Sequence, residues 1–153
     1  MTTTIDTPTL PSSVRPRRRL RVLLVDDARA EREIYCTHLR GAGYDVQVAT
    51  DGLEAIACAV VRRPDAIVID AGAVRLDTWE VTRRLKAAAA TRDIPVIAMS
   101  GRDPLQAAER ARAAGCAGCL EGPFTPEDLR AELDRQLGEY RPRPRRRGRA
   151  GRV

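Results

Sequence analysis

Aromatic residues are scarce in this chain, making up 3% of its 153 residues. We therefore expect Val, Ile, Leu and Ala to build the hydrophobic core. No apolar run approaches the roughly 20 residues that a membrane-spanning helix needs, and the N-terminus lacks the charged-then-apolar pattern of a secretion signal. These absences predict a soluble, cytoplasmic chain with no membrane span, long enough for one ordinary domain.

Cysteine and histidine are also few. The four Cys are expected to be reduced thiols rather than a disulfide framework. Cys116 and Cys119 form a C-x-x-C pair, but a zinc site needs about four ligands. We interpret the pair as buried or half-buried small residues, with a redox dithiol as the alternative. The only His is His38, which we place at the boundary of a helix face, so a kinase-type phosphohistidine function is not expected.

Acidic residues are missing from the C-terminal end. Residues 141–153 carry seven Arg and no acid, and residues 1–19 carry four Arg against one Asp. The formal net charge of +6 therefore belongs to the ends, and residues 20–140 are mildly acidic. We predict a disordered basic arm (1–19), a folded domain (20–140) and a disordered Arg-rich tail (141–153). This distribution argues against nucleic-acid binding by the folded domain. The basic ends could still bind polyanions weakly and without specificity.

The most informative stretch is residues 66–70, Ala-Ile-Val-Ile-Asp. It is a short apolar run that is β-branched at three positions and ends in one acid. Such a run is typical of a strand buried on both faces of a parallel sheet. Open α/β sheets bind their ligands at the carboxyl ends of the strands. We therefore predict that Asp70 is the reactive group.

Strand-like and helix-like patterns alternate five times along the folded part. The predicted strands cover residues 20–25, 44–49, 66–70, 94–99 and 117–120, and a stripe with helical spacing follows each. This alternation predicts an α/β fold, a doubly wound parallel sheet with right-handed crossovers and helices on both faces. Asp51 and Glu54 predict a capping box at the second helix. The buried stripe of that helix is expected at Leu53, Ile56, Ala57 and Val60.

Acids gather where the predicted strands end. Asp26 and Asp27 end the first strand, Asp70 ends the third, and Ser100 ends the fourth. At 4 Å and an effective dielectric near 20, two carboxylates repel by about 4 kcal/mol. A hard divalent cation such as Mg²⁺ would relieve this repulsion, as would protonation. The alternative role for such acids is to cap the helices that follow.

These segments together resemble a response-regulator receiver domain, of the chemotaxis-regulator-like, single-domain kind. The resemblance covers about residues 20–140 and rests on residues 22–27, 64–70, 94–100 and 115–124. It implies the flavodoxin-like fold, a five-stranded parallel sheet in the order 2-1-3-4-5. It also implies a two-component signalling protein rather than an enzyme, with at most Mg-dependent self-phosphorylation and self-dephosphorylation.

The resemblance implies roles for the residues at the strand ends. Asp70 would be the phosphoacceptor, its carboxylate attacking a phosphohistidine on a histidine kinase or phosphotransfer protein. Ser100 would hydrogen-bond the new phosphoryl group. Mg²⁺, which neutralises phosphoryl oxygens during transfer, would be held by Asp26, Asp27, Asp70 and the backbone carbonyl of Gly72.

Four positions depart from the family's pattern. The family's Lys before the Pro of the last loop is Gly122 here, and its aromatic switch residue on the fifth strand is Cys119. The family's Pro four residues after the acceptor is Val74, and its Gly eight residues after is Thr78. The alternative function is therefore a phosphorylation-independent pseudo-receiver that binds partners constitutively. Retention of the three acids and Ser100 favours phosphorylation.

The surroundings of the acceptor give further expectations. The family resemblance implies a cis peptide bond between Gly122 and Pro123. Trp79 follows the Asp70 loop, and we expect its fluorescence to respond to Mg²⁺. The resemblance implies output by protein–protein interaction through the surface of residues 103–140. A third function, from another class, is a nucleic-acid-associated protein that uses its basic ends.

Overall fold

The computed structural model describes residues 18–72, 77–101 and 104–138. Within these residues, five strands and five helices alternate along the chain. The predicted alternation is confirmed, and the strand boundaries differ from the predicted ones by no more than two residues. In chain order the elements are β1 (Arg21–Val25), α1 (Arg29–Gly41), β2 (Asp45–Ala49), α2 (Gly52–Arg62), β3 (Ala66–Asp70), α3 (Thr78–Ala87), β4 (Val96–Ser100), α4 (Pro104–Ala114), β5 (Gly118–Glu121) and α5 (Pro126–Gly138).

The strands of the described residues form one parallel sheet in the order β2-β1-β3-β4-β5. The register pairs Val25 of β1 with Ile69 of β3, and Asp70 with Met99 of β4. A parallel sheet places all the carboxyl ends of its strands at one edge. The ends of β1, β3 and β4 are therefore neighbours, and the predicted flavodoxin-like fold is confirmed.

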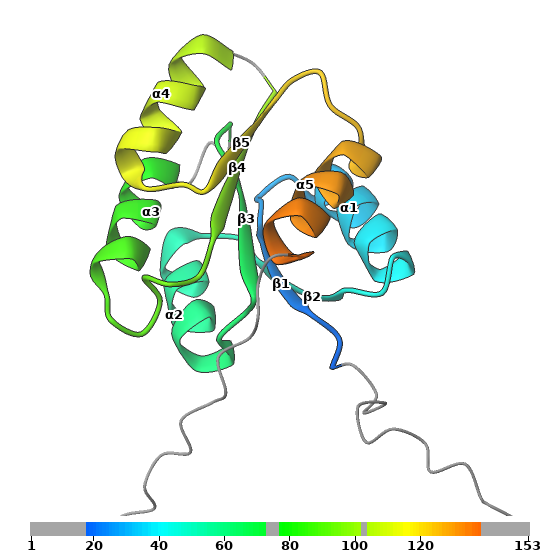
Figure 1. Cartoon of the computed structure of the whole chain (residues 1–153), viewed down its shortest axis with the longest axis horizontal. Helices are drawn as coiled ribbons and strands as arrows, with labels where there is room; N and C mark the ends of the chain where they lie inside the picture. Colours follow the sequence, from blue (N-terminus) through cyan, green and yellow to red (C-terminus); the bar gives the residue numbers. More distant parts are fainter. Residues whose placement is uncertain (1–17, 73–76, 102–103, 139–153) are drawn as a thin grey trace, which may run out of the picture.

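Helices cover both faces of this sheet, with α1 and α5 on one face and α2, α3 and α4 on the other (Figure 1). Successive side chains of a strand point to opposite faces. Accordingly, Leu23 and Val25 of β1 pack toward α2 and α3, whereas Val22 and Leu24 pack toward α1 and α5. All four are fully buried. The core is largely aliphatic, as the scarcity of aromatic residues predicts.

The packing of α2 is not as the sequence predicts. Its closest contact with the sheet is made by Ala55 and Ala59, both fully buried, with Ile56 partly buried beside them. Nearly every residue from 53 to 61 is apolar, so the helical period fits more than one face. Small side chains let the helix approach the sheet closely, and this packing selects the buried face. The remaining residues that were predicted to be buried are exposed: Leu53, Ala57 and Val60.

The N-terminus of α2 matches the expected capping pattern in part. The Asp51 carboxylate accepts a hydrogen bond of 2.8 Å from the backbone N–H of Glu54, as an N-cap does. The Glu54 carboxylate accepts from the backbone N–H of Thr50 at 3.2 Å, one residue earlier than in a standard capping box. The first turn of α2 is therefore held from both directions.

All four cysteines are free thiols, as expected. Cys36 is buried, and the other three are partly buried. Burial raises the pKa of the Cys116 thiol to about 11 and also raises the pKa of Cys119. Because the thiolate is the reactive form, this favours a packing role over a redox dithiol. His38 is partly buried on α1, in keeping with its predicted place at a face boundary.

The predicted arm and tail lie almost wholly outside the described residues. Of the arm, the structure describes Arg18 and Arg19, and the Arg18 guanidinium forms an ion pair of 2.9 Å with Asp65. Residues 141–153 lie outside the described part, as does Val74. Within the described part, none of the helices combines the length and apolar character that crossing a bilayer requires.

Candidate functional site

Asp26 and Asp70 lie at the same edge of the sheet because β1 and β3 are neighbouring parallel strands. The structure brings these two acids together with a third, Glu31, from the first turn of α1. Each residue offers one carboxylate oxygen, and the three oxygens all lie within 4.8 Å of one another. The convergence expected from the strand ends is therefore present.

Asp26 is fully buried, although it carries an ionisable group. Its Oδ1 accepts a hydrogen bond of 2.9 Å from the backbone N–H of Ala28, while its Oδ2 has no hydrogen-bond partner among the described residues. Burial raises the pKa of the Asp26 carboxyl to about 6, and the negative charges of Asp70 and Glu31 add to the shift. At neutral pH the buried Asp26 therefore carries a negative charge at a cost in stability, which a bound cation would relieve.

Asp70 accepts two hydrogen bonds from residues that follow it, one from a backbone N–H and one from a side-chain hydroxyl. Its Oδ1 accepts a hydrogen bond of 2.9 Å from the backbone N–H of Gly72, and its carbonyl accepts one of 2.7 Å from Thr78 Oγ1. Burial raises the pKa of the Asp70 carboxyl, and the hydrogen bond from Gly72 opposes that shift. Thr78, at the position where the family has Gly, therefore ties the start of α3 to the residue that ends β3.

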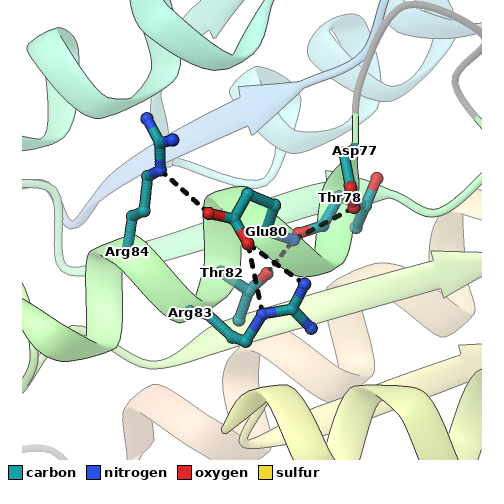
Figure 2. Close-up of polar contacts among 6 residues, drawn as sticks. All are labelled: Asp77, Thr78, Glu80, Thr82, Arg83 and Arg84. Atoms are coloured by element: carbon teal, nitrogen blue, oxygen red, sulfur yellow. Dashed lines mark hydrogen bonds and ion pairs between the residues drawn. The ribbon is translucent and has the colours of Figure 1, made fainter.

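The first turns of α3 are braced by polar contacts (Figure 2). The Asp77 carboxylate caps the helix by accepting a 3.1 Å hydrogen bond from the backbone N–H of Glu80. Thr82 Oγ1 donates to the Thr78 carbonyl at 2.8 Å. These contacts fix the position of Thr78 beside Asp70. On the outer side of the helix, the Glu80 carboxylate forms ion pairs of 3.1 Å with Arg83 and Arg84.

A cavity of about 380 Å³ opens at the acidic edge of the sheet. Asp27 lines it, so this third predicted acid faces the same space as Asp70, although it is not part of the tight cluster. On another side of the cavity, the rings of Tyr35 and Phe124 stack with their centroids 6.2 Å apart. The cavity is therefore lined by carboxylates and by one pair of aromatic rings.

Ser100 ends β4, the strand that neighbours β3. It is 5% exposed and lines a second cavity, of about 170 Å³. Trp79 lines the same cavity, which places this single tryptophan beside the acceptor loop. The other residues that line it are Ala71, Gly72, Gly101, Gln106, Ala107 and Arg110.

Gly122, at the position of the family's Lys, lies directly against the loop after β4. Its backbone N–H donates a 2.7 Å hydrogen bond to the Ser100 carbonyl. A Cβ at Gly122 would lie 2.9 Å from the Cα of Gly101 and 3.0 Å from its carbonyl oxygen. The Gly122–Pro123 peptide bond is cis, as expected. The absent side chain thus permits a close backbone approach at this position.

Sequence reasoning missed Glu31. It belongs to α1 rather than to a strand end, and our search followed only the acids at strand ends. No pattern in the sequence pointed to it, because its approach to Asp26 and Asp70 depends on how α1 packs beside the sheet. The structure places Gly72 beside Asp70 through its backbone N–H, and the role of its carbonyl as a metal ligand stays a prediction.

The folded part of the chain is similar to known proteins. The family model "Response regulator receiver domain" matches residues 22–134. "Response regulator MprA" of Mycobacterium leprae (strain TN) is 37% identical over 123 residues, which are 80% of this chain and 53% of MprA. The chain thus spans about half the length of the curated relatives that it matches.

Two solved structures share the fold at similar identity. The chemotaxis response regulator CheY4 of Vibrio cholerae has 30% sequence identity and a TM-score of 0.72, covering 78% of this chain and 100% of CheY4. The receiver domain of the sensor histidine kinase PA1611 from Pseudomonas aeruginosa PAO1 has 30% identity and a TM-score of 0.72, covering 79% of this chain and 99% of that domain. That structure has a magnesium ion coordinated in its active-site cleft. With the family match spanning most of the sheet and the acids at its carboxyl edge, this chain belongs to the response-regulator receiver-domain family.

Proposed function

We propose that this domain accepts a phosphoryl group on Asp70 from a histidine kinase or phosphotransfer protein. The observation that carries the proposal is the position of the Asp70 carboxylate. It lies at the carboxyl end of β3, within 4.8 Å of Asp26, and lines a cavity open to an incoming group. A carboxylate is a usable nucleophile near pH 7. Membership of the receiver family supports this reaction over the other reactions of α/β folds.

The residues present fit a divalent cation. Hard cations take oxygen ligands, and the buried Asp26 Oδ2 lacks a partner among the described residues. We propose that Mg²⁺ is held by Asp26, Asp27, Asp70 and the Gly72 carbonyl. When bound, Mg²⁺ supplies positive charge that neutralises phosphoryl oxygens during transfer. The magnesium ion in the related PA1611 receiver structure supports the choice of metal.

In the proposed transfer, a carboxylate oxygen of Asp70 attacks the phosphorus of a phosphohistidine. The P–O bond to Asp70 forms as the P–N bond breaks, and the imidazole of the partner leaves with the bonding electron pair. The Gly72 N–H, 2.9 Å from Asp70 Oδ1, orients the carboxylate for this attack. The Ser100 hydroxyl would then donate a hydrogen bond to the acyl phosphate.

The output would be protein–protein interaction through the surface of residues 103–140, from α4 through β5 to α5. The receiver domain itself would comprise residues 20–140. Residues 1–19 and 141–153 would form a basic arm and an Arg-rich tail available to weak, non-specific polyanion binding, and the protein would act in the cytoplasm. Gel shifts across a range of salt concentrations with and without residues 141–153 test the polyanion binding, because phosphate contacts weaken steeply with salt.

Incorporation of labelled phosphate from a small acyl phosphate or phosphoramidate tests the proposed function. The reaction is run with and without Mg²⁺ on the wild type and on Asp70→Asn. Asp45→Asn is a control, because Asp45 begins β2 at the opposite edge of the sheet and is exposed. We expect Mg²⁺-dependent label in the wild type and the control, and none in Asp70→Asn. Absence of label that depends on Asp70 would leave the phosphorylation-independent pseudo-receiver.

A further inference from the structure

Glu31 places a fourth carboxylate at the edge where the three strand-end acids lie. It comes from the first turn of α1, and its carboxylate oxygen lies within 4.8 Å of those of Asp26 and Asp70. It also lines the cavity that contains Asp27. Glu31 therefore reaches both the tight acidic pair and the open space in front of it.

Glu31 and its helical neighbour Glu33 have different surroundings. The Glu33 carboxylate pairs with Arg29 at 3.1 Å, one turn earlier on α1. Among the described residues, Glu31 makes no such ion pair. The nearest following cation, Arg32, donates to the backbone carbonyl of Asp26 at 3.0 Å rather than to a carboxylate. The charge of Glu31 thus faces other negative charges without a described cation to offset it.

A second observation points to a ligand at this cluster. Asp26 is fully buried, and its Oδ2 has no hydrogen-bond partner among the described residues. Buried polar atoms are nearly always paired, and a bound ion or water is one explanation for an exception. The unpartnered atom belongs to a residue of the same cluster as Glu31. The cluster therefore offers three carboxylate oxygens as ligands, and it contains a buried oxygen that a bound cation would pair.

The loop after β5 adds no positive charge to this edge. Gly122 stands where the family has Lys, and the Gly101 backbone lies where its Cβ would be. The site therefore lacks the family's ammonium group, while Glu31 adds its carboxylate to those of the strand-end acids. Both features increase the negative charge that a bound cation would offset.

We propose that Glu31 is a further carboxylate of the divalent-metal site, acting with Asp26 and Asp70 to bind the cation. This inference rests on the proposed function, since it concerns the same metal site. Additional carboxylate ligands strengthen binding of hard cations by raising the negative charge of the site. Glu31 would thereby set the metal affinity of a site that lacks the family's Lys.

Binding of Mn²⁺ tests the proposal without any reading of activity. Electron paramagnetic resonance counts free Mn²⁺ during a titration of the full chain. We expect Glu31→Gln to weaken Mn²⁺ binding by about tenfold. Glu33→Gln is the matched control, because it removes the same charge from the same helix, and we expect its effect to be less than twofold. A purely long-range electrostatic effect would weaken both variants alike.

The outcomes separate this inference from the proposed function. If Asp26→Asn abolishes Mn²⁺ binding but Glu31→Gln binds as tightly as the wild type, the role of Glu31 is overturned and the metal site stands. Equal weakening by Glu31→Gln and Glu33→Gln also overturns it. If the wild type binds no Mn²⁺, the metal site of the proposed function fails together with the role of Glu31. Circular dichroism of each variant confirms that α1 is retained.

Discussion

Gly122 lies against the backbone of Gly101 because Gly122 carries no side chain. A Cβ on Gly122 would lie 2.9 Å from the Cα of Gly101, closer than real Cβ atoms approach their neighbours. The Gly122 N–H also bonds to the Ser100 carbonyl at 2.7 Å. Any larger residue at position 122 must therefore displace the backbone of Gly101, which directly follows Ser100.

Gly122→Ala should destabilise the protein by about 1–3 kcal/mol, because the new Cβ forces backbone shifts of the kind that overpacking causes. Gly41→Ala is the control. Gly41 ends α1 with no atom within 4 Å of its ideal Cβ, so the same change there should be neutral or stabilising by up to about 1 kcal/mol. Urea unfolding measures both variants. Equal midpoints for Gly122→Ala and the wild type would show that the loop yields without strain.

The raised pKa of Asp26 predicts how the stability of the metal-free protein depends on pH. The folded-state pKa, about 6, lies above the ordinary value of 3.8, so the folded protein binds this proton more tightly than the unfolded chain. The stabilisation is fully present below pH 3.8 and is lost as the pH rises through 6. Its size is about 3 kcal/mol.

Asp26→Asn isolates this contribution, because the amide stays neutral at every pH. We expect the variant to match the wild type near pH 3.5 and to exceed its free energy of unfolding by about 3 kcal/mol at pH 7. Urea titrations in chelator across this range give the difference between the two proteins. A difference that stays constant from pH 3.5 to 7 would contradict the assignment to Asp26.

Mg²⁺ should offset most of that difference in the free energy of unfolding at pH 7, since a ligand that binds only the folded state stabilises it. At a concentration 100 times the dissociation constant the gain is about 2.7 kcal/mol. We expect it in the wild type and not in Asp26→Asn. Thermal unfolding with and without Mg²⁺ measures the gain, and an equal shift in both proteins would point to a different binding site.

Trp79 should report the same binding through its fluorescence. It lines the cavity that contains Ser100 and Gly72, and it is the single Trp of the chain. We expect a saturable change in emission on Mg²⁺ titration of the wild type, and none in Asp26→Asn. An unchanged wild-type signal would count against an intact metal site beside this cavity.

Thr78→Val should destabilise the protein and slow labelling of Asp70. The change removes the 2.7 Å hydrogen bond from a buried hydroxyl to the Asp70 carbonyl, which costs about 1–3 kcal/mol. Thr91→Val is the matched control. Thr91 is equally buried and donates to the Leu85 carbonyl at 2.6 Å, at the far end of α3. It should cost similar stability and leave the labelling rate unchanged, and a parallel loss in both would assign the effect to folding alone.

Much of this protein can be predicted from local patterns. The stretch 66–70 is short, β-branched and apolar, and its alternation with helical stripes left a parallel sheet as the consistent fold. Since parallel strands end at one edge, the placement of Asp26 and Asp70 at that edge followed from the alternation of strands and helices, whereas the order that makes β1 and β3 neighbours was implied by the family resemblance. The strands and helices can be predicted because their hydrophobic periodicity depends on residues close together in the sequence. The geometry of a parallel sheet then places all the strand ends at one edge.

Tertiary structure alone decided three other features. The face of α2 that packs on the sheet depends on how closely Ala55 and Ala59 fit against it, because an almost wholly apolar helix has no single preferred face. The approach of Glu31 to Asp70 depends on the angle at which α1 leaves β1. The contact of Gly122 with Gly101 joins two loops from different strands. Each is a relation between segments that are brought together only by packing, so no local pattern encodes it.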